Sequence, residues 1–194
     1  MSTFGDRERE NRVTDDLRAR FEGEALPHLR AVLTVARRLT RRDDDARDLT
    51  QEAFLRAFGK FESFASGTNC KAWLFTITYS LFVNRYRRQR REPALMTVDD
   101  QDTALDERAA AAQSPRVSTP ARAAVEADVE AALAELPEEF RAAIVLVDVE
   151  DLSYEEAAAV LVCPVGTVRS RLFRARKLLA IRLRDYDVAE RRGR

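Results

Sequence analysis

Histidine, cysteine, glycine and proline are scarce in this 194-residue chain, and each scarcity narrows the class of protein. His28 is the only histidine, and Cys70 and Cys163 are the only cysteines, so neither a disulfide framework nor a His/Cys zinc site is indicated. Six glycines and six prolines, set among many Ala, Leu and Arg residues, favour helices throughout. No cofactor is expected from this composition.

Long apolar runs are also missing. No stretch of about 18 apolar residues occurs, so no transmembrane helix and no membrane insertion are expected. The N-terminal segment MSTFGDRERENR is charged and lacks the apolar core of a signal peptide. The sequence therefore predicts a cytoplasmic protein.

Acidic residues are absent from one long stretch, Pro164 to Arg184, although the chain as a whole carries 33 acidic and 33 basic residues. An exposed helix normally mixes both signs, so an all-basic helix indicates a polyanionic partner. On charge alone, a solvated basic face in an ordinary helical bundle remains the alternative.

The residues around this basic stretch have the pattern of a helix-turn-helix. Ser153 and Glu156 form a capping box that predicts a helix start, and Pro164 suits the first turn of the next helix. Val168 and Leu172 belong to an apolar face of that second helix, which would enter the DNA major groove. The residues predicted to contact DNA are Thr167, Arg169, Ser170, Arg171, Phe173, Arg174 and Lys177.

The run DVEDLSYEEAAAVLVCPVGTVRSRLFRAR, from Asp148 to Arg176, resembles the C-terminal DNA-binding domain of bacterial sigma factors, in particular the extracytoplasmic-function (ECF) group. The resemblance implies that this helix-turn-helix reads the −35 promoter element, with Arg169, Ser170, Phe173 and Arg174 at the contacting positions. Val162 stands where related sequences usually carry glycine, and a β-branched residue is costly at positive φ.

A second motif lies in the segment Asp43 to Phe58, which reads as a helix with Ala46, Leu49, Ala53 and Ala57 on its core side. A separate stripe of this helix resembles the polymerase-binding helix of sigma factors, which meets the β′ clamp. The predicted polymerase-binding residues are Asp44, Asp48, Gln51, Glu52 and Leu55. A solvated face is one alternative. A carboxylate metal site on Asp43, Asp44, Asp48 and Glu52 is another, but one helix stripe supplies too few oxygen ligands for a hard cation, so no metal is predicted.

The segment Cys70 to Arg91 carries two apolar faces, one with Leu74, Ile77 and Leu81 and one with Phe75, Tyr79 and Phe82, and it ends in arginines. Aromatic residues interleaved with arginine suit single-strand binding, although packing in the core is the commoner use of such faces and of the preceding Phe61 and Phe64.

This segment resembles the part of sigma factors that melts and reads the −10 element, and Ser80 stands where many relatives have Asn. The residues predicted to contact this element, from the resemblance and from the exposed aromatics of the preceding loop, are Phe61, Phe64, Trp73, Ser80, Asn84, Arg87 and Arg88.

These motifs predict an all-α chain of two small helical domains joined by a flexible linker, with the helix-turn-helix in the second domain. In the segment before Asp43, one buried helix face is expected to contain Leu29, Leu33, Ala36 and Leu39. The linker is rich in acidic residues, Ser and Pro. The predicted ranges are a tail over 1–13, a region 2-like domain over 14–93, the linker over 94–120, a region 4-like domain over 121–185 and a tail over 186–194.

The resemblance implies a sigma factor that binds core RNA polymerase through the β′ clamp and the β flap, recognises promoter DNA and performs no covalent chemistry. It also implies a cognate anti-sigma factor as a partner. Two rivals remain from the residues alone. One is an autonomous helix-turn-helix regulator, which usually needs a dimer to match paired half-sites. The other is the carboxylate metallohydrolase.

Overall fold

The computed structural model describes residues 15–91 and 120–192, and within these ranges every regular element is helical. The predicted N-terminal tail and nearly all of the predicted linker lie outside the described residues. The elements after a first helix over residues 15–24 are η1 (Leu26–His28), α2 (Leu29–Thr40), α3 (Asp43–Lys60), η2 (Phe61–Ser63), α4 (Cys70–Arg91), α5 (Pro120–Ala134), α6 (Glu138–Ile144), the π-helical turn η4 (Val145–Val149), α7 (Tyr154–Leu161) and α8 (Val165–Arg192). The prediction of an all-α chain is confirmed.

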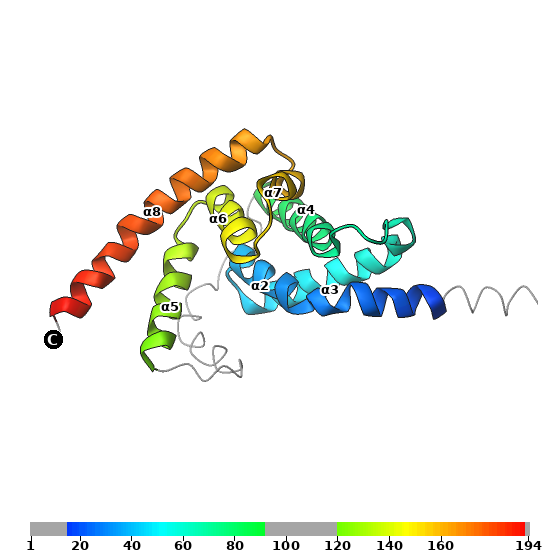
Figure 1. Ribbon diagram of the computed structural model, residues 1–194, viewed down its shortest axis with the longest axis horizontal. Helices are drawn as coiled ribbons and strands as arrows, with labels where there is room; N and C mark the ends of the chain where they lie inside the picture. Colours follow the sequence, from blue (N-terminus) through cyan, green and yellow to red (C-terminus); the bar gives the residue numbers. More distant parts are fainter. Residues whose placement is uncertain (1–14, 92–119, 193–194) are drawn as a thin grey trace, which may run out of the picture.

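Helices α2, α3 and α4 pack on one another and form the N-terminal half of the molecule (Figure 1). The predicted core side of α3 is confirmed, because Ala46, Leu49, Ala53 and Ala57 are all fully buried. Three of these four side chains are alanines, so the backbone of α3 can approach its neighbours closely.

The predicted buried face of α2 is confirmed at Ala36 and Leu39, whereas Leu33 is half-buried and Leu29 is exposed. The buried residues are Val32, Val35, Ala36 and Leu39, whereas Leu29 is 44% exposed. The structure therefore follows the complete i, i+3, i+4, i+7 pattern that begins at Val32.

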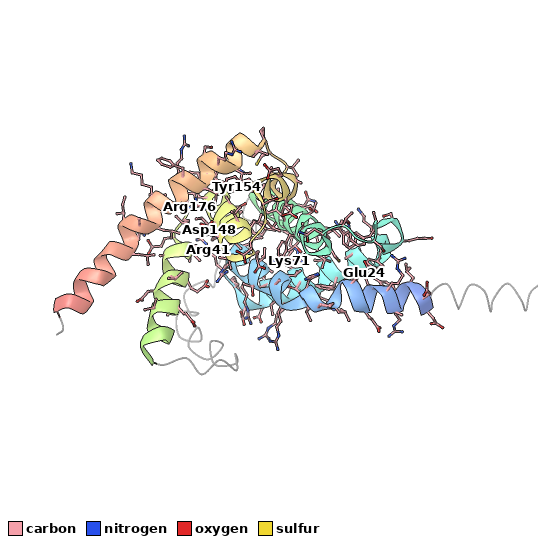
Figure 2. All side chains as sticks on the ribbon, in the orientation of Figure 1. Glu24, Arg41, Lys71, Asp148, Tyr154 and Arg176 are labelled. Atoms are coloured by element: carbon pink, nitrogen blue, oxygen red, sulfur yellow. The ribbon has the colours of Figure 1, made fainter. Side chains whose placement is uncertain are left out.

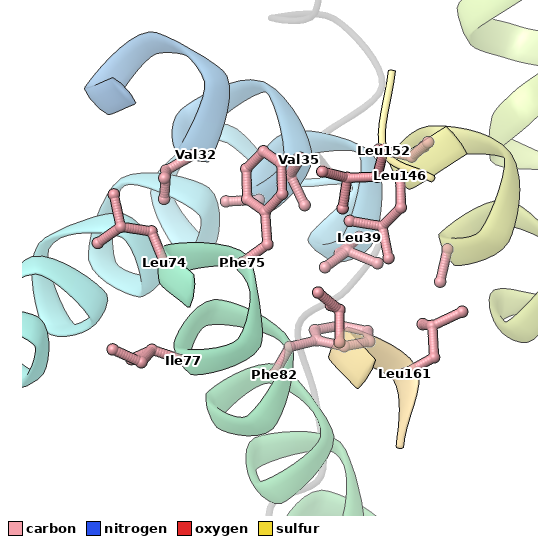
Figure 3. Packing of buried hydrophobic residues seen from close by; sticks show 14 of the residues in the cluster. Val32, Val35, Leu39, Leu74, Phe75, Ile77, Phe82, Leu146, Leu152 and Leu161 are labelled. Atoms are coloured by element: carbon pink, nitrogen blue, oxygen red, sulfur yellow. The ribbon is translucent and has the colours of Figure 1, made fainter. Parts of the chain in front are cut away.

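Both apolar faces of α4 are used. Leu74, Ile77 and Leu81 are buried, and so are Phe75 and Phe82. Figure 3 shows Phe75 and Phe82 among residues from both halves of the chain. These neighbours are Val35 and Leu39 of α2 together with Leu146, Leu152 and Leu161 of the C-terminal half. The second face of α4 is thus the surface on which the helix-turn-helix packs, and the two halves share one continuous apolar cluster.

Polar contacts border this shared cluster. Lys71 Nζ donates to the Glu150 carbonyl oxygen at 2.5 Å and lies 3.4 Å from Glu150 Oε2. Asn69 Nδ2 donates to Glu156 Oε1 at 2.5 Å. Burial raises the pKa of the Glu150 carboxyl, and the neighbouring Lys71 opposes that shift. The start of α4 is therefore bonded to the segment that leads into the helix-turn-helix.

Arg141 is a buried cation at the same boundary, with 3% exposure. Its guanidinium donates to the carbonyl oxygens of Ala134 at 3.2 Å, Leu136 at 3.1 Å and Leu39 at 3.4 Å. Burial lowers the pKa of Arg141 to about 10, and the nearby Arg41 adds to the effect. Arg141 therefore links the ends of α5 and α2 through carbonyl oxygens, which favour a cation at a helix C-terminus.

The turn between α7 and α8 contains a strained β-branched residue. The Ser153–Glu156 capping box begins α7 as predicted, and Val162 ends the helix with φ 49° and ψ 51°. This is the left-handed conformation in which glycine is usual, so the missing glycine is replaced by a strained valine. The Val162 side chain is 84% exposed, and no packing compensates for the strain.

Helix α8 continues to Arg192, so the backbone is helical across most of the range predicted as a C-terminal tail. The sequence has no glycine or proline from Thr167 to Arg192, and Gly193 follows the last helical residue. A helix without such interruptions has no local signal to end at residue 186.

We expect the Val162→Gly variant to be more stable than the wild type by roughly 0.5–1 kcal/mol. Relief of the left-handed strain should exceed the extra chain entropy that glycine has when unfolded. Thermal denaturation should show a rise of about 2 °C for a chain of this length. The control Val160→Gly, at a buried position inside α7, should lower the melting temperature. An unchanged or lower melting temperature for Val162→Gly would contradict the strain at this residue.

Because the two halves share one apolar core, they should stay associated after the chain is cleaved between them. We expect limited proteolysis to cut first within residues 94–120 and to leave two folded fragments that elute together on gel filtration. Lys71→Glu places like charge beside Glu150 and should separate the fragments after cleavage, whereas Lys60→Glu, at the exposed end of α3, should not. A first cut inside α4, or separate elution of the wild-type fragments, would show that the shared core is wrong.

Candidate nucleic-acid and polymerase interfaces

Helix α8 is fixed by its apolar face, as its spacing predicts. Val168, Leu172 and Ala175 are buried, with no more than 1% exposure. They pack against α6 and α7, so the opposite face of α8 points away from the protein. Figure 1 shows α8 at the edge of the molecule, with no other helix over its outer side.

The outer face of α8 presents most of the predicted DNA-contacting residues. Arg169, Ser170, Phe173, Arg174 and Lys177 are exposed, and Thr167 is half-buried. Phe173 is 71% exposed, which is unusual for a phenylalanine. Within the described ranges, no acidic side chain pairs with Arg174 or Lys177. The face therefore combines free cations, a hydroxyl and an apolar ring, as base and phosphate contacts require.

Three further cations of α8, Arg171, Arg176 and Arg182, have protein partners among the described residues. Arg171 Nη2 lies 3.2 Å from Glu139 Oε2, and Arg182 forms an ion pair with Glu135. Arg176 donates Nε to Asp148 Oδ2 at 2.9 Å and Nη2 to Asp148 Oδ1 at 2.6 Å. The structure thus separates Arg171 from the other predicted DNA-contacting residues, because its helical position turns it toward α6.

The predicted polymerase-binding stripe of α3 is also on the surface. Asp44, Asp48, Gln51 and Leu55 are exposed, and Leu55 has 67% exposure. Glu52 differs from the other four, because its carboxylate is half-buried and accepts a hydrogen bond from Arg85 Nη2 of α4 at 2.5 Å. Four members of the stripe are therefore free to meet a partner, and the fifth ties α3 to α4.

The predicted −10 residues fall into three groups. Ser80 and Asn84 are exposed one turn apart on α4, and Trp73 is half-buried two turns before Ser80 on the same face. The Ser80 hydroxyl donates to the Ile77 carbonyl oxygen at 2.9 Å. Arg87 and Arg88 belong to α4, but their side chains lie outside the described residues.

Phe61 and Phe64 form the third group and are not on the surface. Their exposure is 0% and 7%, and their rings stack on each other with centroids 5.5 Å apart. The Phe64 ring lies 4.8 Å from the Trp73 ring. The structure thus has both phenylalanines in the core, which is the alternative that the sequence left open, and contact with a base would require them to leave it.

Most of the residues that join the two halves carried no recognisable signal in the sequence. Asn69 was expected only to cap α4, which it does by accepting from the Ala72 amide at 3.1 Å, and Lys71 carried no prediction. Arg141 does have a signal, because it interrupts the otherwise apolar run FRAAIVLV. A cation inside such a run is expected to be buried and to need oxygen partners.

Metal-ligand clusters and membrane-spanning helices are both absent among the described residues. No group of three or more His, Cys, Asp or Glu side chains is placed to hold a metal ion in that part of the chain. Likewise, no helix among the described residues is long and apolar enough to cross a membrane.

Comparison with protein families finds two matches in the predicted order. Residues 26–92 match Sigma-70 region 2, and residues 126–179 match Sigma-70, region 4. The first match contains α3 and α4, and the second contains the whole helix-turn-helix.

Curated relatives extend the similarity over most of the chain. The ECF RNA polymerase sigma factor SigE of Mycolicibacterium smegmatis is 42% identical over 82% of this chain and 58% of that protein. The ECF RNA polymerase sigma factor EcfG of Rhodopseudomonas palustris is 40% identical over 87% of this chain and 85% of that protein. The ECF RNA polymerase sigma-E factor of Escherichia coli is 35% identical over 70% of this chain and 72% of that protein.

Solved structures of similar proteins also include sigma factors. The sigma factor RpoE of Bartonella quintana, in complex with the anti-sigma factor NepR, has a TM-score of 0.64 and 32% identity, over 84% of this chain and 96% of that chain. CnrH in complex with the cytosolic domain of CnrY has a TM-score of 0.55 and 27% identity, over 91% of this chain and 90% of that chain. The chain therefore belongs to the ECF group of RNA polymerase sigma factors, the proteins that bind core RNA polymerase and direct promoter-specific transcription initiation.

Proposed function

We propose that the two surfaces on α3 and α8 divide the work of this sigma factor, with α3 on the β′ clamp of core polymerase and α8 on the −35 element. The observation that carries the proposal is the outer face of α8, where Arg174 and Lys177 have no acidic partner in the described ranges. In a chain with zero formal net charge, free cations on one exposed face favour a polyanion. The protein would act in the cytoplasm, without covalent chemistry of its own.

The α3 surface suits a protein partner better than DNA. Asp44 and Asp48 would repel phosphates, whereas Leu55 offers exposed apolar area beside them. Phe58 is 39% exposed one turn after Leu55 and extends the apolar part of the surface. Acidic and apolar groups together favour a basic protein surface with an apolar centre.

The −10 element would be read along the exposed line of Trp73, Ser80 and Asn84 on α4. In this proposal the buried Phe61 and Phe64 do not contact a base. Their rings pack against the Trp73 indole and hold it in place. Ser80 would release its bond to the Ile77 carbonyl oxygen when a base is present.

The two halves would have to separate to occupy both promoter elements. The elements lie about 25 base pairs apart, or about 85 Å at 3.4 Å per base pair, whereas α4 and α7 pack directly against each other. The residues between the halves, 92–119, number about 28 and can reach about 90–100 Å when extended. The chain is therefore long enough to let the domains bind the two elements at once.

A protein that binds the free sigma factor is a further expected partner. The two solved chains described above are each in complex with another protein, which is described as the anti-sigma factor NepR in one case. We propose a cognate anti-sigma factor for this chain on that basis, together with the β flap as a second polymerase contact.

The experiment that tests the division of labour is Asp48→Arg. The substitution reverses an exposed charge and should alter stability by within about 0.5 kcal/mol, so the variant should melt as the wild type does. Binding to a −35 duplex should be unchanged, because α8 is untouched. Assembly with core polymerase and promoter-dependent transcription in vitro should fail.

Asp16→Arg is the matched control, since Asp16 is an exposed acidic residue on the first helix and the net charge changes equally. It should transcribe normally. A folded Asp48→Arg protein with normal transcription would remove the α3 stripe from the mechanism. Wild-type binding to paired −35 half-sites as a dimer, without any polymerase-dependent transcription, would instead favour the autonomous regulator.

A further inference from the structure

The paired cations of α8 hold the helix on both of its flanks. Arg171 reaches Glu139 of α6 on one flank through a single contact of 3.2 Å. Arg176 reaches Asp148 on the other flank through two hydrogen bonds, of 2.9 Å and 2.6 Å. A bidentate guanidinium–carboxylate pair fixes orientation as well as distance, so the Asp148 side holds α8 more firmly than the Glu139 side.

Tyr154 joins this pair to the DNA-facing side of α8. It is the first residue of α7, and its side chain, after that of Asp148, helps to raise the pKa of Arg176. The guanidinium carbon of Arg169 lies 5.9 Å from the centroid of the same ring, within the range of a cation–π contact. Figure 2 shows Asp148, Tyr154 and Arg176 close together where α8 passes the start of α7.

We propose that Asp148 and Arg176 are positioning residues for −35 recognition: the pair sets the angle of α8 against η4, beside the start of α7, where the Tyr154 ring places the Arg169 guanidinium for DNA. The inference rests on the proposed reading of the −35 element by α8. Arg176 does not contact DNA itself in this role, because two of its donors are already bonded to Asp148.

The alternative is that Arg176 binds a phosphate, like any other cation of a DNA-binding helix. The two roles differ in their dependence on Asp148. A phosphate contact is weakened by a nearby carboxylate, so removal of the Asp148 charge should strengthen binding to every DNA sequence. A positioning pair loses base discrimination when either partner is removed, although the net charge becomes more favourable.

The test compares the full-length wild type with Asp148→Asn by fluorescence anisotropy. The probes are a −35 duplex selected by the wild type from a randomised pool, a scrambled duplex, and duplexes with single base-pair changes. The specificity ratio is the affinity for the selected −35 duplex divided by the affinity for the scrambled duplex. We expect this ratio to fall about tenfold in Asp148→Asn, within the range of one lost bidentate base contact. The loss should extend over several base pairs, whereas Arg174→Ala, which removes a proposed direct contact, should lose discrimination at one or two.

Glu139→Gln is the matched control, because it also removes one negative charge and one of the ion pairs that α8 makes. It should keep the ratio. Arg176→Lys preserves the charge but cannot form the bidentate pair, so it should lower the ratio while the dependence of affinity on salt keeps its slope. Melting temperatures report folding, and the double variant Asp148→Asn with Arg176→Lys should lose no more than either single variant if the two residues act as a unit.

Two results would overturn the positioning role. One is an unchanged ratio in Asp148→Asn, with tighter binding to both duplexes. The other is a normal ratio in Arg176→Ala with a salt slope lower by about one, which is the signature of a lost phosphate contact. If the wild type itself shows no sequence preference, the proposed −35 reading fails, and that outcome is distinct from either.

Discussion

The second apolar face of α4 is the constraint on which the rest of the structure depends. A helix with one apolar face could complete the N-terminal half alone, but Phe75 and Phe82 would then be exposed to water. Burying a phenylalanine side chain contributes about 1.5–3 kcal/mol, so these two rings favour a covering partner strongly. In this structure the C-terminal half covers these rings. The covering residues include Leu146 of η4, Leu152 and Leu161 of α7.

The boundary between the halves combines apolar packing with buried charged groups, one of which has a nitrogen without a hydrogen-bond partner in the described part of the chain. Arg141 is buried with carbonyl oxygens as its partners, and its Nε has no hydrogen-bond partner among the described residues. Glu150 is buried beside Lys71, which offsets part of the cost. Buried charges of this kind add little net stability. An interface built this way can hold the halves together and still release them when polymerase and DNA offer better contacts.

The elements of the fold could be predicted from local patterns, because capping, helical period and helix breakers act over a few residues. Examples are the Ser153–Glu156 capping box and the alanine core of α3. What local patterns could not supply is the relation between distant segments. The bonds of Lys71 to Glu150 and of Arg176 to Asp148 join residues far apart in sequence, and charge alone placed Arg171 with the DNA-facing residues. The burial of Phe61 and Phe64 could not be decided from the sequence for the same reason, since burial depends on which helices cover them.

The two halves are packed together in the free chain, and we expect them to lie apart on a promoter. The direct measurement is the distance between spin labels on Lys60→Cys and Ala131→Cys, two exposed positions in different halves, with Cys70 and Cys163 replaced by alanine. Double electron–electron resonance should give one short distance in the free chain and an increase of several tens of ångströms, on the order of the roughly 85 Å promoter spacing, in the holoenzyme on promoter DNA. An unchanged distance in a complex that initiates transcription normally would contradict the claim.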